Sequence, residues 1–172
     1  MKYQGLAIPD TPTVDDLKAI LPDYTAICTT AIRAIADRHD PAYPFANTKF
    51  DLITGSNFPD DDPIRGKQAI YGWIQGRALE ALAGHARWLS AYGNQDNLVA
   101  RLDTMTRDVL DQLRRMRDRN GGHLSFFMYP DGTPFRLAPE NRPVPFGGSD
   151  TPAYGFSDLF SSKGMFAAAR HL

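Results

Sequence analysis

The chain has 172 residues, 42% of them hydrophobic and 23% charged, which is the composition of a globular protein that can bury a sizeable core as one domain. Its 19 basic and 20 acidic residues give a formal net charge of −1, which argues against a nucleic-acid binder or a polybasic membrane anchor. No run of about 18 apolar residues is present, and the acidic first twenty residues do not resemble a signal peptide. We therefore expect a cytoplasmic protein that does not enter a membrane.

Two helices are predicted within the first forty residues. Thr13 is a favourable N-cap for a short helix over Val14–Leu21. Pro22 is expected to end that helix and to open a second one, from Asp23 to about His39. Cys28, the single cysteine, falls among apolar residues of the second helix, so we interpret it as a small core residue; a nucleophile is the alternative.

Residues 40–66 form a long irregular stretch. Phe50–Thr54 is predicted to be a short strand before the turn at Gly55. The acidic run Asp60–Asp62 is typical of a solvated turn, and its spacing does not match a defined cation-binding loop, so we expect no metal there. Because connections of this length are often functional, the stretch is a candidate for site residues.

The segment Lys67–Leu89 is predicted to be one long helix. Arg77 lies at the centre of an apolar face, and a second apolar strip runs beside that face, so the helix is expected to be buried over most of its circumference. The main face comprises Ile70, Trp73, Ile74, Arg77, Ala81, Gly84 and Trp88; the second strip comprises Tyr71, Ala78, Leu82 and Leu89; the polar back comprises Gly76, Glu80, Arg87 and Ser90.

A buried arginine is costly unless it is paired or reaches water. One interpretation is therefore a buried ion pair, or an arginine that extends its charge to the surface. The other is a pocket floor, with Trp73 and Tyr71 as flat walls and Arg77 as a fixed hydrogen-bond donor. Aromatic rings beside polar donors suit a polyhydroxylated ring, whose C–H faces stack on aromatics.

A second long helix is predicted from Gln95 to Arg119, after a break at Gly93-Asn94. It has one apolar stripe and a charged opposite side, so we expect an outer helix packed antiparallel to the inner helix before it. A pair of one inner and one outer helix is the repeating unit of a helical toroid around a central pocket.

The last third of the chain is predicted to contain a β-hairpin over 123–137 and a mostly apolar helix from Gly155 or Phe156 to the end. His123 precedes the hairpin and is either a catalytic base or a structural residue. Asp158 lies in the first turn of the last helix, where it either compensates the helix dipole or pairs with Arg77.

Three motifs, in order and spacing, resemble the N-acylglucosamine 2-epimerase family over about residues 20–172. The first is the pattern Trp73-x-Gln75-x-Arg77. The second is a Gly pair ending at Gly122, followed by two aromatic residues and an Asp-Gly turn at Asp131-Gly132. The third is Tyr154 with the run Phe156–Phe160.

The resemblance implies an all-α fold, the (α/α)6 barrel of twelve helices. Residues 1–172 would then form a single N-terminal fragment of that barrel domain, with about four of its helices and a short β-hairpin near 123–137. It also implies an isomerase of carbohydrate metabolism that epimerises a sugar at C2 or interconverts aldose and ketose. The substrate would be a monosaccharide or disaccharide, and we expect no cofactor.

By the same resemblance, Arg77 is the catalytic residue that binds the sugar oxygens and stabilises an enediolate. Tyr71, Trp73 and Gln75 line or support the pocket, and Asp158 orients Arg77. The acid/base histidines of the family lie on later helices. The four histidines of this chain match none of those positions: His39, His85, His123 and His171.

Two alternatives remain at this point. One is a six-hairpin glycoside hydrolase or unsaturated-uronyl hydrolase, which needs two carboxylates facing the pocket. Asp158 is the one candidate for that role, since Glu80 falls on the predicted polar back. The other is a non-catalytic remnant that binds carbohydrate or completes its barrel as a homo-oligomer, because the apolar last helix has no predicted outer partner.

Overall fold

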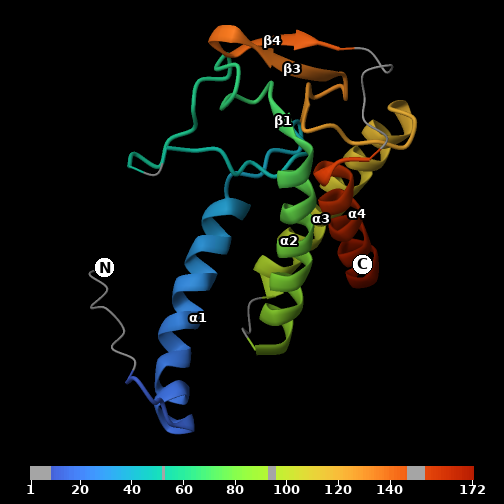
Figure 1. Ribbon diagram of the computed structural model, residues 1–172. Helices are drawn as coiled ribbons and strands as arrows, with labels where there is room; N and C mark the ends of the chain where they lie inside the picture. Colours follow the sequence, from blue (N-terminus) through green and yellow to red (C-terminus); the bar gives the residue numbers. More distant parts are fainter. Residues whose placement is uncertain (1–8, 52, 93–95, 147–153) are drawn as a thin grey trace.

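The computed structural model describes residues 9–51, 53–92, 96–146 and 154–172. Within these ranges the chain is mainly helical, with a small antiparallel sheet over one end of the helices (Figure 1). The helices are α1 (Val14–Ala36), α2 (Gly72–Tyr92), α3 (Asp96–Arg119) and α4 (Phe156–His171). The strands are β1 (Ile70–Tyr71), β2 (Phe127–Met128), β3 (Pro134–Ala138) and β4 (Arg142–Pro145), with the 3-10 turn η1 (Pro139–Asn141) before β4.

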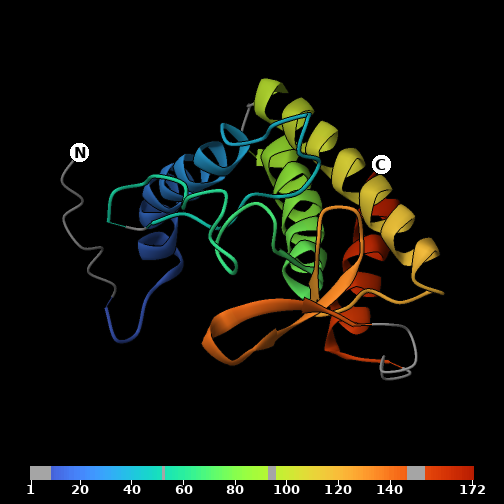
Figure 2. The same cartoon turned by 90° about the horizontal axis from the view of Figure 1, so that it is seen from above.

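Helix α2 is the central element of the fold. It packs along α4 on one side and along α3 on another, and α1 lies on its remaining side (Figures 1 and 2). The sheet lies over the end at which α2 and α4 begin (Figure 1). Every functional residue predicted on α2 therefore faces either a packed neighbour or the space toward α1.

The contact between α2 and α4 is made by glycines. A Cβ at Gly76 would lie 2.5 Å from the carbonyl of Phe160, and Gly164 of α4 in turn lies against the backbone of Gly76. The Ser161 hydroxyl donates to the Gly72 carbonyl at 3.1 Å. Gly76 is thus buried at the tightest contact of the fold, and its assignment to a polar back was wrong.

Helix α2 begins at Gly72, so the prediction of one helix from Lys67 was wrong at its start. Ile70 and Tyr71 form β1 instead and pair with Met128 and Phe127 of β2. The helical periodicity continues through these residues, but pairing with β2 decides their conformation.

Helix α1 is a single helix that continues through Pro22, where a break was predicted. The prolyl ring removes one backbone hydrogen bond, and at this exposed position water can satisfy the carbonyl left without a partner. Thr13 caps the helix as predicted, with its hydroxyl accepting from the Asp16 amide at 3.2 Å. Only Ile32 and Ala36 of α1 are buried, so the helix docks by its C-terminal end (Figure 1).

Helix α3 carries the predicted apolar stripe. Its buried residues pack against α2 in two clusters, one with Ile32 and Ala36 of α1 and one with Phe45 and Ala46 of the irregular stretch. Cys28 is half-buried at the edge of the first cluster. The buried side chains of α3 are Leu98, Leu102, Met105, Thr106, Val109, Leu110, Leu113 and Met116.

Two histidine–aspartate pairs attach other elements to α3. His39, after α1, lies 2.9 Å from Asp108, and His171, at the end of α4, lies 2.6 Å from Asp103. Both imidazoles are thereby committed to holding helices together.

The predicted hairpin over 123–137 is confirmed as β2 and β3, and the sheet has the order β1-β2-β3-β4. The predicted strand at Phe50–Thr54 was wrong: Phe50 makes an isolated bridge with Asn57, and residue 52 lies outside the described residues. The acidic run forms a turn in which Asp62 accepts from the amides of Ile64 and Arg65. The break predicted at Gly93-Asn94 also lies outside the described residues. No helix in the described ranges has the length and apolar character needed to cross a membrane.

Candidate functional site

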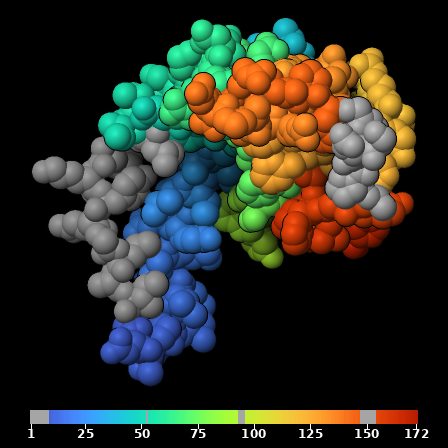
Figure 3. Space-filling model, turned by 45° about the horizontal axis from the view of Figure 1, so that its top comes forward, coloured from blue at the N-terminus to red at the C-terminus, as the bar shows by residue number. Residues whose placement is uncertain are grey.

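A groove runs along the side of α2 that faces α1. It consists of two adjoining hollows of about 570 and 340 Å³, which share Glu80 and Ala81. In Figure 3 the surface is recessed between α1, in blue, and α2, in green. We call this feature the α2 groove; its principal residues are Tyr24, Cys28, Thr48, Trp73, Arg77, Glu80, Ala81, Gly84, His85 and Trp88.

Arg77 is exposed in the larger hollow. Among the described residues it makes no ion pair and no hydrogen bond, and its guanidinium carbon lies 5.7 Å from the centre of the Phe160 ring. The expectation of a buried, paired arginine was therefore wrong. Its guanidinium donors are available to a molecule in the groove.

Trp73 lies one turn before Arg77 and is half-buried. Its ring stacks on Phe126, with centroids 6.2 Å apart and an interplanar angle of 28°, and tilts against Phe160 at 6.3 Å. Its indole Nε1 is buried and has no partner within the described residues. Neighbouring rings thus hold Trp73 in place beside Arg77 in the lining of the larger hollow, and its role in binding stays a prediction.

Gln75 is buried and supports the groove from behind. Its Oε1 accepts from the Ala46 amide at 2.9 Å, and its Nε2 donates to the Ala46 carbonyl at 3.0 Å. These two hydrogen bonds to the backbone of one residue fix the loop that brings Thr48 to the larger hollow. The predicted supporting role fits this geometry, whereas a direct role in lining does not.

Tyr71 is half-buried in β1, and it packs edge-on against Phe126 and Phe127, with centroids 5.9 and 4.8 Å away. Its hydroxyl donates to the Ile64 carbonyl at 3.2 Å. Burial raises the pKa of this phenol. Tyr71 therefore supports Trp73 through Phe126, rather than forming the second flat wall that was predicted.

Asp158 does not pair with Arg77, so that interpretation was wrong. One carboxylate oxygen accepts from the Leu124 amide at 2.8 Å, and the other accepts from the Gly155 amide at 2.9 Å. The second oxygen also lies 3.4 Å from Nδ1 of His123. Asp158 thus caps the start of α4 and ties it to the segment before β2, in line with the dipole interpretation.

Glu80 lines both hollows, although the sequence placed it on a polar back. Its carboxylate pairs with Lys163 of α4 at 2.9 Å. The larger hollow therefore contains one charge of each sign, from Arg77 and Glu80, and Glu80 is paired with Lys163 of α4.

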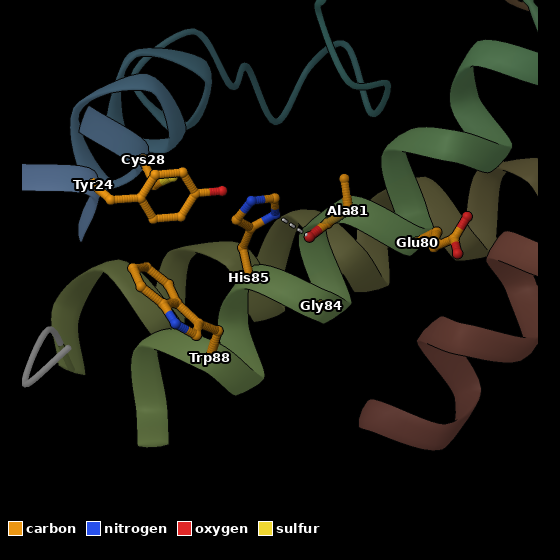
Figure 4. Close-up of a pocket in the computed structure, with 7 residues that line it drawn as sticks. All are labelled: Tyr24, Cys28, Glu80, Ala81, Gly84, His85 and Trp88. Atoms are coloured by element: carbon orange, nitrogen blue, oxygen red, sulfur yellow. Dashed lines mark hydrogen bonds between the residues drawn. The ribbon is translucent and has the colours of Figure 1, made fainter. Parts of the chain in front are cut away.

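The smaller hollow lies between α1 and the second half of α2 (Figure 4). His85 approaches the Ala81 carbonyl at 2.6 Å through Nδ1; as donor in that bond, Nδ1 carries the proton and Nε2 is free to accept. Tyr24 extends from α1 toward His85 in Figure 4, and a hydrogen bond with Cys28 raises the pKa of its phenol. The sequence predicted that Gly84 and Trp88 share the Arg77 face, but it gave no sign that α1 provides the opposite wall.

Lys49 is a second residue that sequence reasoning missed. Its Nζ donates to the carbonyls of Gly66 and Ala69, each at 2.5 Å, and lies 5.4 Å from the centre of the Tyr71 ring. Burial lowers the pKa of this amine to about 8, against the opposing effect of Asp62. An isolated lysine in an irregular stretch carries no pattern that predicts such burial.

Comparisons of the sequence with protein-family models and curated proteins, and of the structure with solved structures, found no match. The described residues also contain no group of three or more His, Cys, Asp or Glu side chains arranged to hold a metal ion. The α2 groove and the motifs within it are therefore the basis for a functional assignment.

Proposed function

We propose that the chain carries the sugar-binding side of an N-acylglucosamine 2-epimerase-type isomerase, which transfers a proton at C2 of an aldose. The observation that carries the proposal is Arg77, a cation that has no ion pair within the described part of the chain and lies in an open groove with the fixed indole of Trp73 beside it. The proposed fold is part of an (α/α)6 barrel, in which α2 and α4 are inner helices and α3 is an outer helix.

The chemistry explains why an open arginine suits this reaction. Removal of the C2 proton from an open-chain aldose leaves its electron pair in an enediolate, whose negative charge lies on the oxygens at C1 and C2. A guanidinium within hydrogen-bond reach of those oxygens stabilises the charge as it forms. Return of the proton to C2 on the opposite face gives the epimer. Its return to C1, with transfer of the hydroxyl proton from O2 to O1, gives the ketose.

None of the four histidines of this chain lies beside Arg77 in a position to transfer the C2 proton. His39 and His171 are bonded to aspartates of α3, and His123 lies next to the Asp158 cap. Only His85 lines the groove, in the smaller hollow. The proposal therefore gives this chain substrate binding and charge stabilisation, and gives proton transfer to histidines on further helices of the barrel.

The test on this chain is binding of aldoses by calorimetry; exchange of the C2 proton in D2O, followed by NMR, tests an assembly that also supplies the acid/base histidines. We expect Arg77→Ala to weaken binding at least tenfold, which is the loss expected for a charge-assisted hydrogen bond of about 1.5–3 kcal/mol, and to abolish exchange in that assembly. Arg87→Ala, at an exposed position of the same helix outside the groove, is the matched control. Exchange or binding that does not depend on Arg77 would contradict the proposal.

The hydrolase alternative has less support, because both oxygens of Asp158 accept hydrogen bonds from backbone amides and Glu80 is paired with Lys163.

Self-association is favoured by a separate observation. Large apolar side chains are exposed on two helices: Val14, Leu17, Leu21 and Tyr24 on α1, and Phe156, Leu159 and Phe166 on α4. Sedimentation would detect self-association as a native mass at a multiple of 19.1 kDa.

A further inference from the structure

The α2 groove continues past Arg77 for the remaining length of the helix. Beyond Ala81 it opens into the smaller hollow, which ends at Trp88. We propose that the groove binds a linear oligosaccharide, with its reducing-end unit at Arg77 and the following units along α2 to Trp88. The inference rests on the proposed function, which supplies the Arg77 end of the site.

The length of the groove exceeds that of a small substrate. Trp73 and Trp88 are fifteen residues apart on one helix, which at a rise of 1.5 Å per residue places them roughly 22 Å apart along the axis. A monosaccharide or disaccharide does not span this distance, whereas a short linear oligosaccharide does. The two indoles, one at each end, are platforms on which the C–H faces of sugar rings stack.

Small residues of α2 form the surface of the groove between the two tryptophans. Ala81 lies at the junction of the two hollows, and a Cβ built at Gly84 meets no atom within 4 Å. The surface of α2 is thus open at Gly84, and the side chains of Glu80 and His85 flank this opening. This contrasts with Gly76, where the absent side chain is replaced by the backbone of α4.

The charges give the bound chain a direction. At one end Arg77 has no ion pair among the described residues, whereas Glu80 is paired with Lys163. Beyond Glu80 the hollow presents the phenol of Tyr24, the imidazole of His85 and the indole of Trp88 (Figure 4). The reducing end, on which negative charge develops, therefore matches the Arg77 end, and neutral hydroxyl-bearing units match the other end.

The chain contains only two tryptophans, and they mark the two ends of the groove. Trp73→Phe leaves Trp88 as the one indole fluorophore, and Trp88→Phe leaves Trp73. We would titrate both variants with linear glucose and mannose oligomers from monomer to hexamer. The expected result is that monomers change the Trp73 emission alone, and that Trp88 emission responds only to the longer oligomers.

Calorimetry with the unsubstituted chain should show affinity rising about tenfold from the monomer to the longest oligomers, the gain expected for one further stacked ring. Gly84→Phe fills the middle of the groove and should remove this gain. Ser90→Phe, the same substitution at an exposed position of α2 outside the groove, should retain it.

The outcomes separate the two proposals. Arg77-dependent monomer binding with no gain for longer oligomers and no response of Trp88 would overturn the extended groove and leave the proposed function standing. Absence of sugar binding at every length would overturn both. A length-dependent gain that survives Gly84→Phe would place the oligosaccharide elsewhere and overturn the groove as its site.

Discussion

The two sides of α2 use small residues in opposite ways. Toward α4, Gly76 and the facing Gly164 let two backbones approach until no space remains for a methyl group. Toward α1, Ala81 and Gly84 leave open space between two tryptophans. The same residue type thus makes a closed interface on one side and a groove on the other, and the neighbouring element decides which.

The polar residues differ in the same manner. On the packed sides the Gln75 side chain makes hydrogen bonds to both the amide and the carbonyl of Ala46. The side chain of Arg77, two residues further along, has no hydrogen-bond partner within the described part of the chain. A polar residue that stabilises the fold has its hydrogen-bond donors and acceptors paired within the protein. A binding site instead presents donors or acceptors that are held in position and left free for a ligand.

The largest effect is expected at the closed interface. In Gly76→Ala the new methyl group would overlap the Phe160 carbonyl and Ser161, both of them backbone that cannot move away without separating α2 from α4. We expect a loss of about 3–5 kcal/mol in the free energy of unfolding, at or above the upper end for overpacking. Urea unfolding followed by circular dichroism measures it; stability within 1 kcal/mol of the unsubstituted chain, on the order of experimental scatter, would contradict the packing.

Gln75→Ala should have the next largest effect. It leaves the buried amide and carbonyl of Ala46 without partners, at a cost of about 2–3 kcal/mol. Urea unfolding measures the cost, and hydrogen exchange should show the Ala46 amide losing its protection. An unchanged hydrogen-exchange rate at Ala46 would mean that a group other than Gln75 protects this amide.

The lowered pKa of Lys49 predicts that the free energy of unfolding depends on pH. Its pKa is about 8 in the folded chain and near 10.5 when unfolded, so between these values the unfolded chain binds more protons. Stability should therefore rise from pH 8 to pH 10, by on the order of 1–2 kcal/mol for this half-buried group. Above that range the raised pKa values of Tyr43 and Tyr71 act in the opposite direction.

The control for this effect is Lys49→Met, which removes the titrating group. Unfolding curves of the variant should lose the rise between pH 8 and pH 10, whatever its absolute stability. A rise of the same size in the variant would assign the pH dependence to another group.

Gly84→Ala is the matched opposite of Gly76→Ala. The methyl group enters open space, and alanine is the better helix former, so we expect a gain of about 0.5–1 kcal/mol in the free energy of unfolding. Thermal melts of the two variants side by side test the comparison of the two sides of α2. A loss at Gly84 would mean that the groove side is packed as well.

The sequence predicted those helices whose bounds are marked by apolar periodicity and by adjacent glycines. The apolar stripe of α3 and the extent of α4 were placed within one residue, because strong periodicity and adjacent Gly residues define them. The buried side of α2 was misplaced, because glycine has no side chain to signal burial and because Arg77 sits among apolar neighbours that face the groove. The helix through Pro22 and the strand at Ile70 depend on solvent exposure and on pairing with β2, which local pattern does not encode.

For the site, the sequence identified Trp73 and Arg77 as neighbours on one face, since three- and four-residue spacing is sufficient for that. It could not identify the partners of Asp158 or Glu80, because these lie 34 and 83 residues away at Leu124 and Lys163. It also could not place Tyr24 opposite His85, because that proximity depends on how α1 docks (Figure 4).

The most direct test of the central claim, that Arg77 serves a ligand and not the fold, is calorimetric titration of aldoses into Arg77→Ala, with the unfolding free energy of the same sample. We predict that sugar binding falls at least tenfold while stability stays within about 0.5 kcal/mol, as for an exposed side chain with no ion pair or hydrogen bond within the described residues. Retained sugar binding together with lost stability would show that Arg77 holds the fold together and that the groove is not its site of action.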